Sequence, residues 1–302
     1  RMPAFSTSDI EKIISETQGE IYPALPEAVL EGFSPIHESQ SNTLSWMTDQ
    51  PINWNSVKAS VVNCSKNVKS SAEFAGILVP VDNPRLIFTK ILRKFNSNVR
   101  QPKIENTAMI GENCVLGKNI YIGHFVVLED NVVVGDNTEI LHHAVVSHGV
   151  TIGKNVLIKP HAVIGAKGFG FEDEDGIPLS IPHIGNVIID NHAEVGSFTT
   201  VIRGTLGTTW IKEHAKIDDH VHVAHNVTVG RAAKIIACAE VSGSVNVGDG
   251  VWIGPNAAIL DGIVLGEKAF IGMGAVIRKD CTPKGIYVGN PARLLRMSTD
   301  EE

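Results

Sequence analysis

Large aliphatic residues recur at every sixth position through two long stretches of this chain. The first register runs from Ile104 to Ile164 and the second from Ile211 to Ile277. A period of six fits neither the 3.6-residue repeat of a helix nor the alternation of a long strand. It is typical of a β-helix, in which short strands stack coil on coil with the aliphatic side chains inside. We therefore predict a hexapeptide β-helix, in which a glycine such as Gly111, after an aliphatic position, lets the chain turn sharply.

The six-residue period divides the chain into three regions. Residues 1–100 lack it and are predicted to form a small α/β domain, residues 101–282 the β-helix, and residues 283–302 a C-terminal tail. The register breaks twice, between residues 164 and 189 and between residues 201 and 211. Insertions in a solenoid emerge as loops on one face, so we expect these two breaks to lie near a binding site.

Helix and strand signals in the first hundred residues are those of an ordinary α/β fold. Ser8 and Glu11 have the spacing of a capping box, and Gly19 is expected to end the helix that they begin. A second helix is predicted from Pro84, because proline is favoured in a first helical turn. Short strands are expected at residues 44–47, 60–64 and 76–81.

Composition narrows the classes of function that are open. The net charge of −7 gives no basic surface for nucleic acid. No run of about 18 apolar residues occurs, so no membrane span is expected. The four cysteines are far apart and form no CxxC pair, which favours reduced thiols in a cytoplasmic protein over a disulfide scaffold. Neither a metal nor a permanently bound cofactor is expected.

Candidate chemistry centres on His225. Three hexapeptides make one coil, so residues 18 apart stack, and Gly243 is expected directly above His225. A histidine could take a proton from an attacking amine, while the backbone N–H of Gly243 stabilises an oxyanion, as acyl transfer requires. The alternative is that His225 is one of several surface histidines. Asp218 and Asp219 could orient it or merely stabilise a turn.

Two other motifs have both a structural and a functional interpretation. Phe169 and Phe171 lie in the Gly-Phe-Gly-Phe sequence of the first break. Their residue types alone favour an aromatic plug that packs against the core. The functional alternative is a lip over a bound sugar. Histidine pairs five residues apart suggest a zinc hydrolyase of the γ-carbonic anhydrase type, with three histidines and an activated water. That alternative rests on His143, His148, His183, His220 and His225.

The chain resembles the UDP-3-O-acylglucosamine N-acyltransferases of lipid A synthesis over about 280 residues. The resemblance rests on Leu44-Ser45-Trp46, Val81-Asp82-Asn83-Pro84, the stretch Ile164 to Phe171, Thr199 to Gly204, and Ile217-Asp218-Asp219 leading to Ala224-His225-Asn226. It implies a homotrimer of left-handed parallel β-helices, an exception to right-handed crossovers.

The resemblance also assigns roles. It implies that the N-terminal domain holds uridine, with the ring of Trp46 packed on uracil. His225 falls at the family's general base. Phe169 and Phe171 fall in the loop that lines its sugar pocket, and Asn226 and Asp218 are expected to contact substrate.

Departures from the family pattern favour a different acyl donor. Ile202 stands where the family usually has aspartate, and Asp261-Gly262 lacks its second histidine. The chain stops at Glu302 without the family's helical extension for acyl carrier protein. Its ending instead resembles that of hexapeptide acetyltransferases, with Gly274, Ala275 and Arg293 expected to contact acetyl-CoA.

These observations predict a trimeric N-acetyltransferase that acts on a nucleotide-linked amino sugar, with acetyl-CoA as cosubstrate, His225 as base and Gly243 as oxyanion donor. The first alternative is the lipid A enzyme itself, with 3-hydroxyacyl carrier protein as donor. The zinc hydrolyase is a more remote alternative, and a non-enzymatic scaffold is the last, because a fold alone does not imply activity.

Overall fold

The structure, a computed structural model, describes residues 3–48, 53–69, 71–95 and 100–297. Internal contacts divide the chain into two compact units, residues 1–99 and residues 100–302. Each unit has a hydrophobic core of its own.

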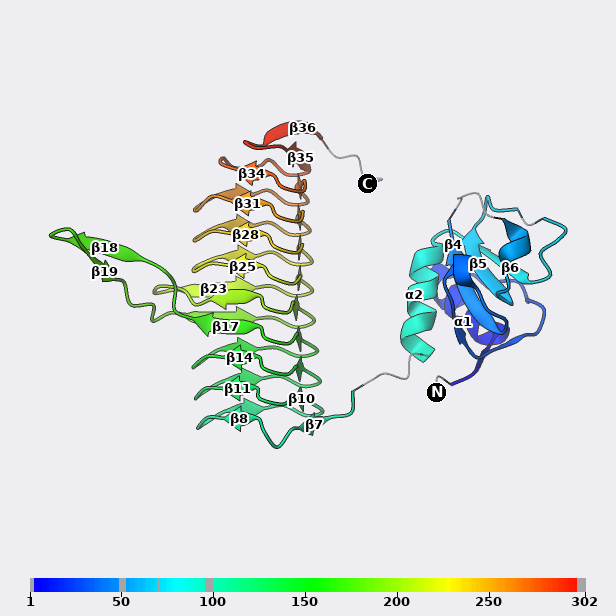
Figure 1. The fold of residues 1–302 in the computed structure, drawn as a ribbon, viewed down its shortest axis with the longest axis horizontal. Helices are drawn as coiled ribbons and strands as arrows, with labels where there is room; N and C mark the ends of the chain where they lie inside the picture. Colours follow the sequence, from blue (N-terminus) through cyan, green and yellow to red (C-terminus); the bar gives the residue numbers. More distant parts are fainter. Residues whose placement is uncertain (1–2, 49–52, 70, 96–99, 298–302) are drawn as a thin grey trace. The chain divides into compact units, whose positions relative to one another are not determined.

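The first unit is a small α/β fold (Figure 1). Its four-stranded sheet is parallel, in the order β3-β4-β5-β6, and both helices contribute buried residues to its core. The elements are β1 (Phe5–Ser6), α1 (Thr7–Gln18), β2 (Val29–Leu30), β3 (Gly32–Phe33), η1 (Ile36–Glu38), β4 (Thr43–Met47), η2 (Trp54–Ser56), β5 (Val61–Ser65), β6 (Ile77–Val81) and α2 (Pro84–Phe95).

The start of α1 differs from the prediction. Its N-cap is Ser6, which exchanges hydrogen bonds with Asp9, so the capping box lies two residues before the predicted one. Glu11 is used elsewhere, because its Oε1 accepts a hydrogen bond of 2.7 Å from the amide of Leu25. The end of the helix is as predicted, with Gly19 in a left-handed conformation at φ 76°.

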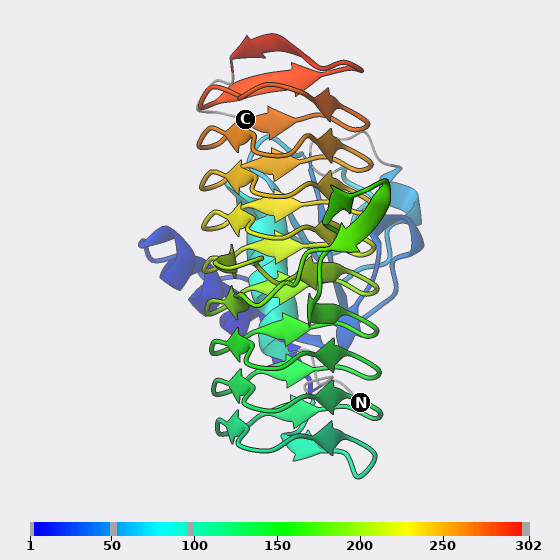
Figure 2. The ribbon, with the colours of Figure 1, turned by 90° about the vertical axis from the view of Figure 1, so that its left-hand side faces the viewer.

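The second unit is the predicted β-helix, a solenoid of three parallel sheets (Figures 1 and 2). One sheet stacks β7 (Lys103–Ile104), β10 (Tyr121–Ile122), β13 (Glu139–Ile140), β16 (Leu157–Ile158), β21 (Glu194–Val195), β24 (Lys216–Ile217), β27 (Lys234–Ile235), β30 (Trp252–Ile253), β33 (Phe270–Ile271), β35 (Gly285–Val288) and, antiparallel at its end, β36 (Arg293–Met297). The next stacks β8 (Met109–Ile110), β11 (Val127–Leu128), β14 (Val145–Val146), β17 (Val163–Ala166), β22 (Thr200–Ile202), β25 (His222–Val223), β28 (Glu240–Val241), β31 (Ala258–Ile259) and β34 (Val276–Ile277). The third stacks β9 (Val115–Leu116), β12 (Val133–Val134), β15 (Thr151–Ile152), β20 (Asn186–Ile189), β23 (Thr208–Ile211), β26 (Thr228–Val229), β29 (Asn246–Val247) and β32 (Val264–Leu265).

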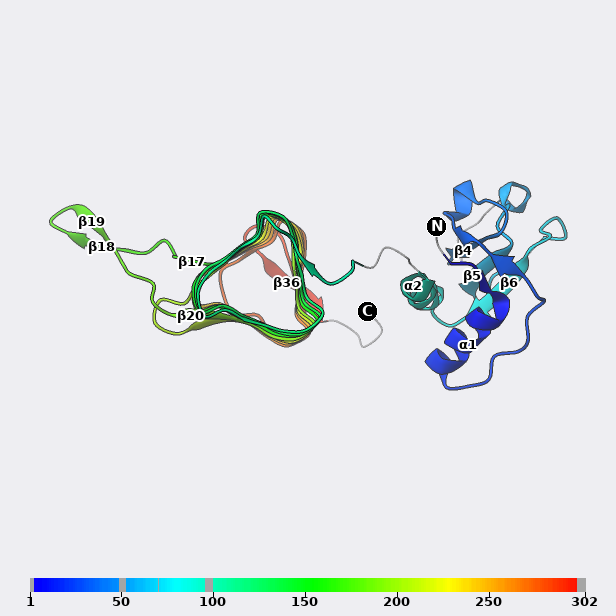
Figure 3. The ribbon, with the colours of Figure 1, turned by 90° about the horizontal axis from the view of Figure 1, so that it is seen from below.

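The aliphatic residues of both registers line the inside of the coils, which are triangular in cross-section (Figure 3). From Ile122 onward every register position is buried. Ile104 and Ile110 remain exposed because they lie in the first coil, at the open end of the stack. Each side of the triangle takes up six residues, and for this reason the buried aliphatic residues recur with a period of six.

Glycine has a different role in the coils from the one predicted. Gly111 and Gly117 do not have positive φ angles; the left-handed positions are Asn113 and Asn119, two residues later. A Cβ on Gly111 would lie 2.6 Å from the amide nitrogen of Asp130 in the next coil. Glycine is needed there because adjacent coils approach closely, whereas asparagine tolerates the left-handed turn.

Both breaks in the register form loops on the solenoid. The first contains a hairpin of β18 (Phe171–Glu174) and β19 (Ile177–Ser180), which projects from the coils (Figures 1 and 3). The second lies between β22 and β23. Residues 298–302 of the predicted tail lie outside the described residues. Among the helices that the structure describes, none has the length and apolar character needed to cross a membrane.

Candidate active site

A pocket of about 390 Å³ lies where the first inserted loop meets strands β22, β25 and β28. Strands β22, β25 and β28 are consecutive neighbours in one sheet, so the residues that follow them stack at one corner of the solenoid. The lining residues are Lys167, Gly168, Phe169, Ile202, His222, Ala224, His225, Glu240, Ser242 and Gly243.

The structure places His225 directly against Gly243, as the 18-residue spacing predicts. A Cβ on Gly243 would lie 2.6 Å from Cε1 and 2.7 Å from Nε2 of the His225 ring, so only glycine fits without displacing the ring. Within the described part of the chain, no hydrogen bond leaves the Gly243 amide. This corner of the solenoid therefore places the imidazole of His225 beside the backbone N–H of Gly243, which donates no hydrogen bond within the described residues.

Asn226 determines the hydrogen-bonding state of this imidazole. Its Oδ1 accepts a hydrogen bond of 3.1 Å from the amide of Thr205, so its Nδ2 faces Nδ1 of His225 at 3.2 Å. An amide NH₂ group only donates, so Nδ1 is the acceptor and the neutral ring carries its hydrogen on Nε2. At the long end of the hydrogen-bond range this contact is weak, and the ring can change tautomer at small cost.

Burial lowers the pKa of His225, and the neighbouring His183 and His222 lower it further. Desolvation disfavours the charged ring, and a second positive charge nearby would repel it. The imidazole is therefore neutral at neutral pH, the state that a general base needs. Burial also raises the pKa of the Glu240 carboxyl, an effect that His222 opposes.

The Gly-Phe-Gly-Phe loop does not plug a core. Phe169 is 88% exposed and Phe171 41% exposed, and their rings meet edge to face with centroids 4.6 Å apart. Phe169 lines the pocket, whereas Phe171 lies beside it at the base of the hairpin. The interpretation as a packed plug is wrong, and the loop has the position of a lip.

Asp218 and Asp219 are not brought to His225. Asp218 Oδ2 accepts a hydrogen bond from the amide of Ala237, and Asp219 Oδ1 accepts one from the amide of Ser197. Both carboxylates stabilise turns between neighbouring coils. Neither lines the pocket.

His222 and Lys167 line the pocket although sequence reasoning did not select them. His222 is paired with Glu240 in register, and its Nδ1 lies 2.6 Å from the hydroxyl of Thr200. The same 18-residue spacing that connects His225 to Gly243 connects His222 to Glu240 and could have identified it. Lys167 carries no such signal, because it lies in an insertion with its own local geometry.

The histidine pairs of the zinc hypothesis separate in space. His143 stacks on His161 with centroids 4.8 Å apart, and His220 stacks on Phe198 at 5.1 Å, in a column of exposed rings. His225 instead contacts His183, with ring centroids 5.4 Å apart. Among the residues that the structure describes, no three side chains of the metal-binding types converge. The geometry therefore does not favour zinc chemistry.

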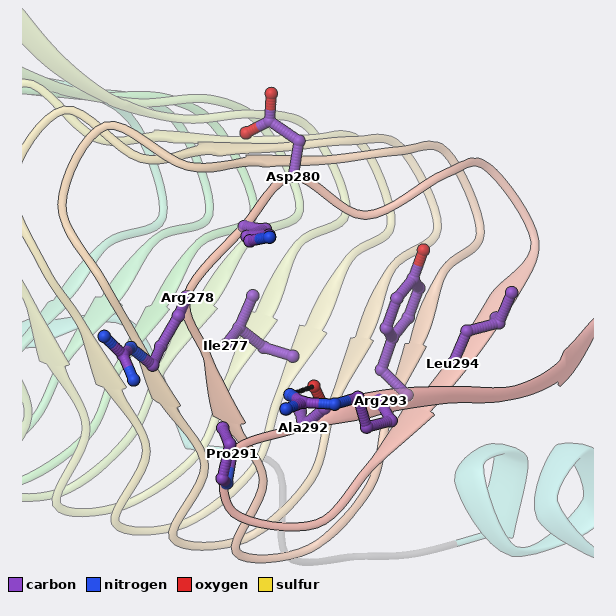
Figure 4. Close-up of a pocket in the computed structure, with 9 residues that line it drawn as sticks. Ile277, Arg278, Asp280, Pro291, Ala292, Arg293 and Leu294 are labelled. Atoms are coloured by element: carbon purple, nitrogen blue, oxygen red, sulfur yellow. Dashed lines mark hydrogen bonds between the residues drawn. The ribbon is translucent and has the colours of Figure 1, made fainter.

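The residues predicted to bind acetyl-CoA do not share one site. Arg293 lines a second pocket of about 540 Å³ near the end of the solenoid, where it follows Pro291 and Ala292 (Figure 4). Arg278, which follows β34, lines the same pocket, with Lys279 beside it. Gly274, however, is an exposed turn residue at φ 65°. Ala275 is buried in the core, so its side chain is unavailable to a ligand.

Trp46 lies in β4 of the first unit. Its ring is half-buried, with its centroid 6.1 Å from that of Phe88 on α2. This leaves part of the indole exposed for stacking, but it also gives the ring a structural contact within the unit.

The fold and the pocket define a hexapeptide-repeat transferase. Residues 107–142, 131–166 and 244–279 match the bacterial transferase hexapeptide (six repeats) family. A solved UDP-N-acetylglucosamine acyltransferase from Bacteroides fragilis 9343 superposes with a TM-score of 0.59 at 27% identity, over 65% of this chain and 74% of that one.

Two curated relatives identify the family more closely. The UDP-3-O-acylglucosamine N-acyltransferase of Methylacidiphilum infernorum is 35% identical in an alignment that covers 95% of this chain and 88% of the relative. That of Fusobacterium nucleatum is 42% identical in an alignment that covers 76% of this chain and 73% of the relative. The chain belongs to the UDP-3-O-acylglucosamine N-acyltransferase family.

Proposed function

We propose that this protein transfers an acyl group from an acyl carrier protein thioester to the amino group of a UDP-3-O-acylglucosamine, in lipid A synthesis. Family membership over nearly the whole chain supports an acyl carrier protein as the donor, the first alternative of the sequence analysis, better than it supports acetylation from acetyl-CoA. The observation that carries the chemistry is the packing of His225 against Gly243 in a pocket lined by the inserted loop.

The reaction forms a carbon–nitrogen bond and breaks a carbon–sulfur bond. The sugar amine attacks the thioester carbonyl carbon while Nε2 of His225 takes up the proton that the amine loses. This step uses the other tautomer of the ring, in which the hydrogen has moved from Nε2 to Nδ1 and the weak contact with Asn226 is given up. The N–H of Gly243 stabilises the oxyanion of the tetrahedral intermediate. As this intermediate collapses, the thiol leaves and receives the proton held by His225.

The donor's arm has a direct route along the solenoid. Ala224, Ser242, Leu260 and Arg278 stack in register, so Arg278 lies three coils from the site. Adjacent strands are about 4.8 Å apart, so three coils span about 14 Å. A phosphopantetheine arm can bridge that distance and place its phosphate near Arg278 and Arg293, whose guanidinium groups suit phosphate.

A donor screen tests the proposal. Purified protein is supplied with UDP-3-O-acylglucosamine and either 3-hydroxyacyl carrier protein or acetyl-CoA, and thiol release is measured. We expect turnover with the carrier protein and at most a small fraction of it with acetyl-CoA. Turnover with acetyl-CoA alone would overturn the proposed donor, and no thiol release with any donor would favour a non-enzymatic scaffold.

Trp46→Ala is expected to weaken binding of the nucleotide sugar and leave affinity for the acyl donor unchanged. Aromatic stacking contributes on the order of 1 kcal/mol beyond the buried area, so the loss should be about fivefold or more. Binding titrations with each ligand check this on folded protein, with Trp54→Ala as a control for loss of an indole in the same unit. A matched loss of both affinities, together with a lower Tm, would assign Trp46 to packing only.

We further propose a homotrimer, as the family resemblance implies. This assembly would let the exposed loop of Phe169 close on a neighbouring copy. Light scattering of the purified protein measures the mass directly.

A further inference from the structure

His183 is the only histidine that is buried among the described residues, with 4% of its surface exposed. It follows the hairpin of β18 and β19 and precedes β20. Its Nδ1 lies 2.9 Å from the carbonyl oxygen of Ile181. A carbonyl only accepts, so Nδ1 carries the hydrogen and donates it, and the neutral ring keeps its lone pair on Nε2.

The Nε2 atom of His183 is buried and has no hydrogen-bond partner among the described residues. An unsatisfied polar group in such a place costs free energy, because it has lost its hydrogen bonds to water. An apolar ring of similar size would avoid that cost, so packing alone does not explain a histidine here. Its neighbours indicate what else this ring does.

On one side, His183 contacts the candidate base. The rings of His183 and His225 are 5.4 Å apart between centroids and inclined at 63°, an edge-to-face arrangement. Asn226 binds the Nδ1 atom of His225, and Gly243 lies against its Cε1 and Nε2. His183 adds a third contact, and together the three restrict rotation of the His225 ring.

On the other side, His183 packs against the loop that lines the pocket. A Cβ on Gly168 would overlap the His183 ring, at 2.8 Å from Cδ2 and closer still to Nε2. The ring is enclosed and cannot easily give way. A Cβ on Gly170 would lie 3.6 Å from its nearest neighbour, His183 Cε1, which is an ordinary van der Waals distance. The ring of His183 thus requires glycine at position 168 but not at position 170.

We propose that His183 is a positioning residue, whose ring connects the Gly168–Phe171 loop to His225 and holds the imidazole of His225 in its place beneath Gly243. The catalytic interpretation rests on the proposed function. The positioning itself does not require turnover and is tested separately below.

Substitution of His183 in the full chain tests the catalytic consequence. His183→Ala is expected to lower kcat by about 10–100-fold, because small displacements of a catalytic group have effects of this size, while each KM changes much less. His183→Phe retains a ring of similar size and should recover most of the lost kcat. Among the residues that the structure describes, the exposed ring of His192 stacks only on His214, so His192→Asn serves as the control with unchanged kcat. Wild-type kcat in His183→Ala, or equal losses in both variants, would overturn the proposal.

The two glycines give a second test that does not depend on the stability of the His183 variants. Gly168→Ala should lower kcat, whereas Gly170→Ala should be tolerated. In the His183→Ala background the overlap disappears, so adding Gly168→Ala should cause little further loss. Independent, multiplicative losses at the two positions would overturn the connection through His183.

An NMR measurement separates failure of this proposal from failure of the proposed function. In protein labelled with ¹⁵N-histidine, the His225 signal is identified by its loss in a His225→Ala variant. Gly168→Ala and His183→Ala should shift that signal, while Gly170→Ala and His192→Asn should not. If no donor supports turnover but the signals shift as expected, the positioning stands and the proposed reaction falls. An unmoved His225 signal overturns the positioning whatever the activity.

Discussion

Replacing His225 with alanine is expected to lower kcat by about 10²–10⁴-fold and to leave the fold intact. Loss of a general base has an effect of this size. The His225 side chain is only partly buried and is not part of the hydrophobic core of the coils. The circular dichroism spectrum and the Tm of the variant should therefore match those of the wild-type protein. Initial rates of thiol release at saturating concentrations of both substrates measure the change.

The pH dependence of kcat/KM provides a second test of His225 as the general base. Burial and two neighbouring histidines lower the pKa of His225, and the base must be unprotonated to act. The value of kcat/KM should therefore stay level as the pH falls through about 6.5, the ordinary histidine pKa, and decline only below it. Lys167, His183, His222 and Glu240 also face this corner, so the decline must be shown to vanish in His225→Ala. Near wild-type turnover in that variant would remove His225 from the mechanism.

Gly243→Val is expected to lower kcat/KM by at least about 10²–10³-fold, the usual effect of losing one oxyanion donor. A Cβ at this position meets the His225 ring at less than 3 Å, and a branched side chain also covers the backbone N–H. The substitution therefore affects both the base and the oxyanion site. Steady-state kinetics with the acyl carrier protein donor would measure the loss, and Gly243→Ala should show an intermediate one.

Backbone strain is not the reason for this loss, because Gly243 is not among the residues with a positive φ angle. Gly176→Asn is a suitable control, since Gly176 lies in the hairpin turn at φ 80° with open space around it, and asparagine tolerates that conformation. The control should keep wild-type kinetics. Unchanged donor affinity and turnover in Gly243→Val would contradict the placement of the donor above His225.

In the first unit, local sequence signals predicted the two helices and the longer strands, but they misplaced the start of the first helix. Strands β4, β5 and β6 and the start of the second helix were predicted within one or two residues, because apolar runs and Pro84 are local signals, whereas the two-residue strands β1, β2 and β3 were not predicted. The capping box was placed at Ser8 and Glu11 because both Ser6 and Ser8 precede the same apolar face. Only the contact between Glu11 and Leu25, which are far apart in sequence, shows that Glu11 is occupied elsewhere.

The stacking of His225 and Gly243 could be predicted because the solenoid turns sequence spacing into distance. Regular coils place residues 18 apart in contact, so no tertiary information was needed at this corner. The exposure of Phe169 could not be predicted in this way. Its loop leaves the coil, and apolar residue types alone suggest burial.

The sequence by itself determined the solenoid, the extent of its coils and the histidine at the centre of the candidate site. A six-residue repeat admits one way of burying its aliphatic side chains, and register follows from it. The tertiary structure alone decided which insertion residues reach that histidine. His183 lies 42 positions before His225 in the chain, and no repeat connects them. They meet because the hairpin returns to the coils at that corner, and Gly168 leaves room for the ring between them.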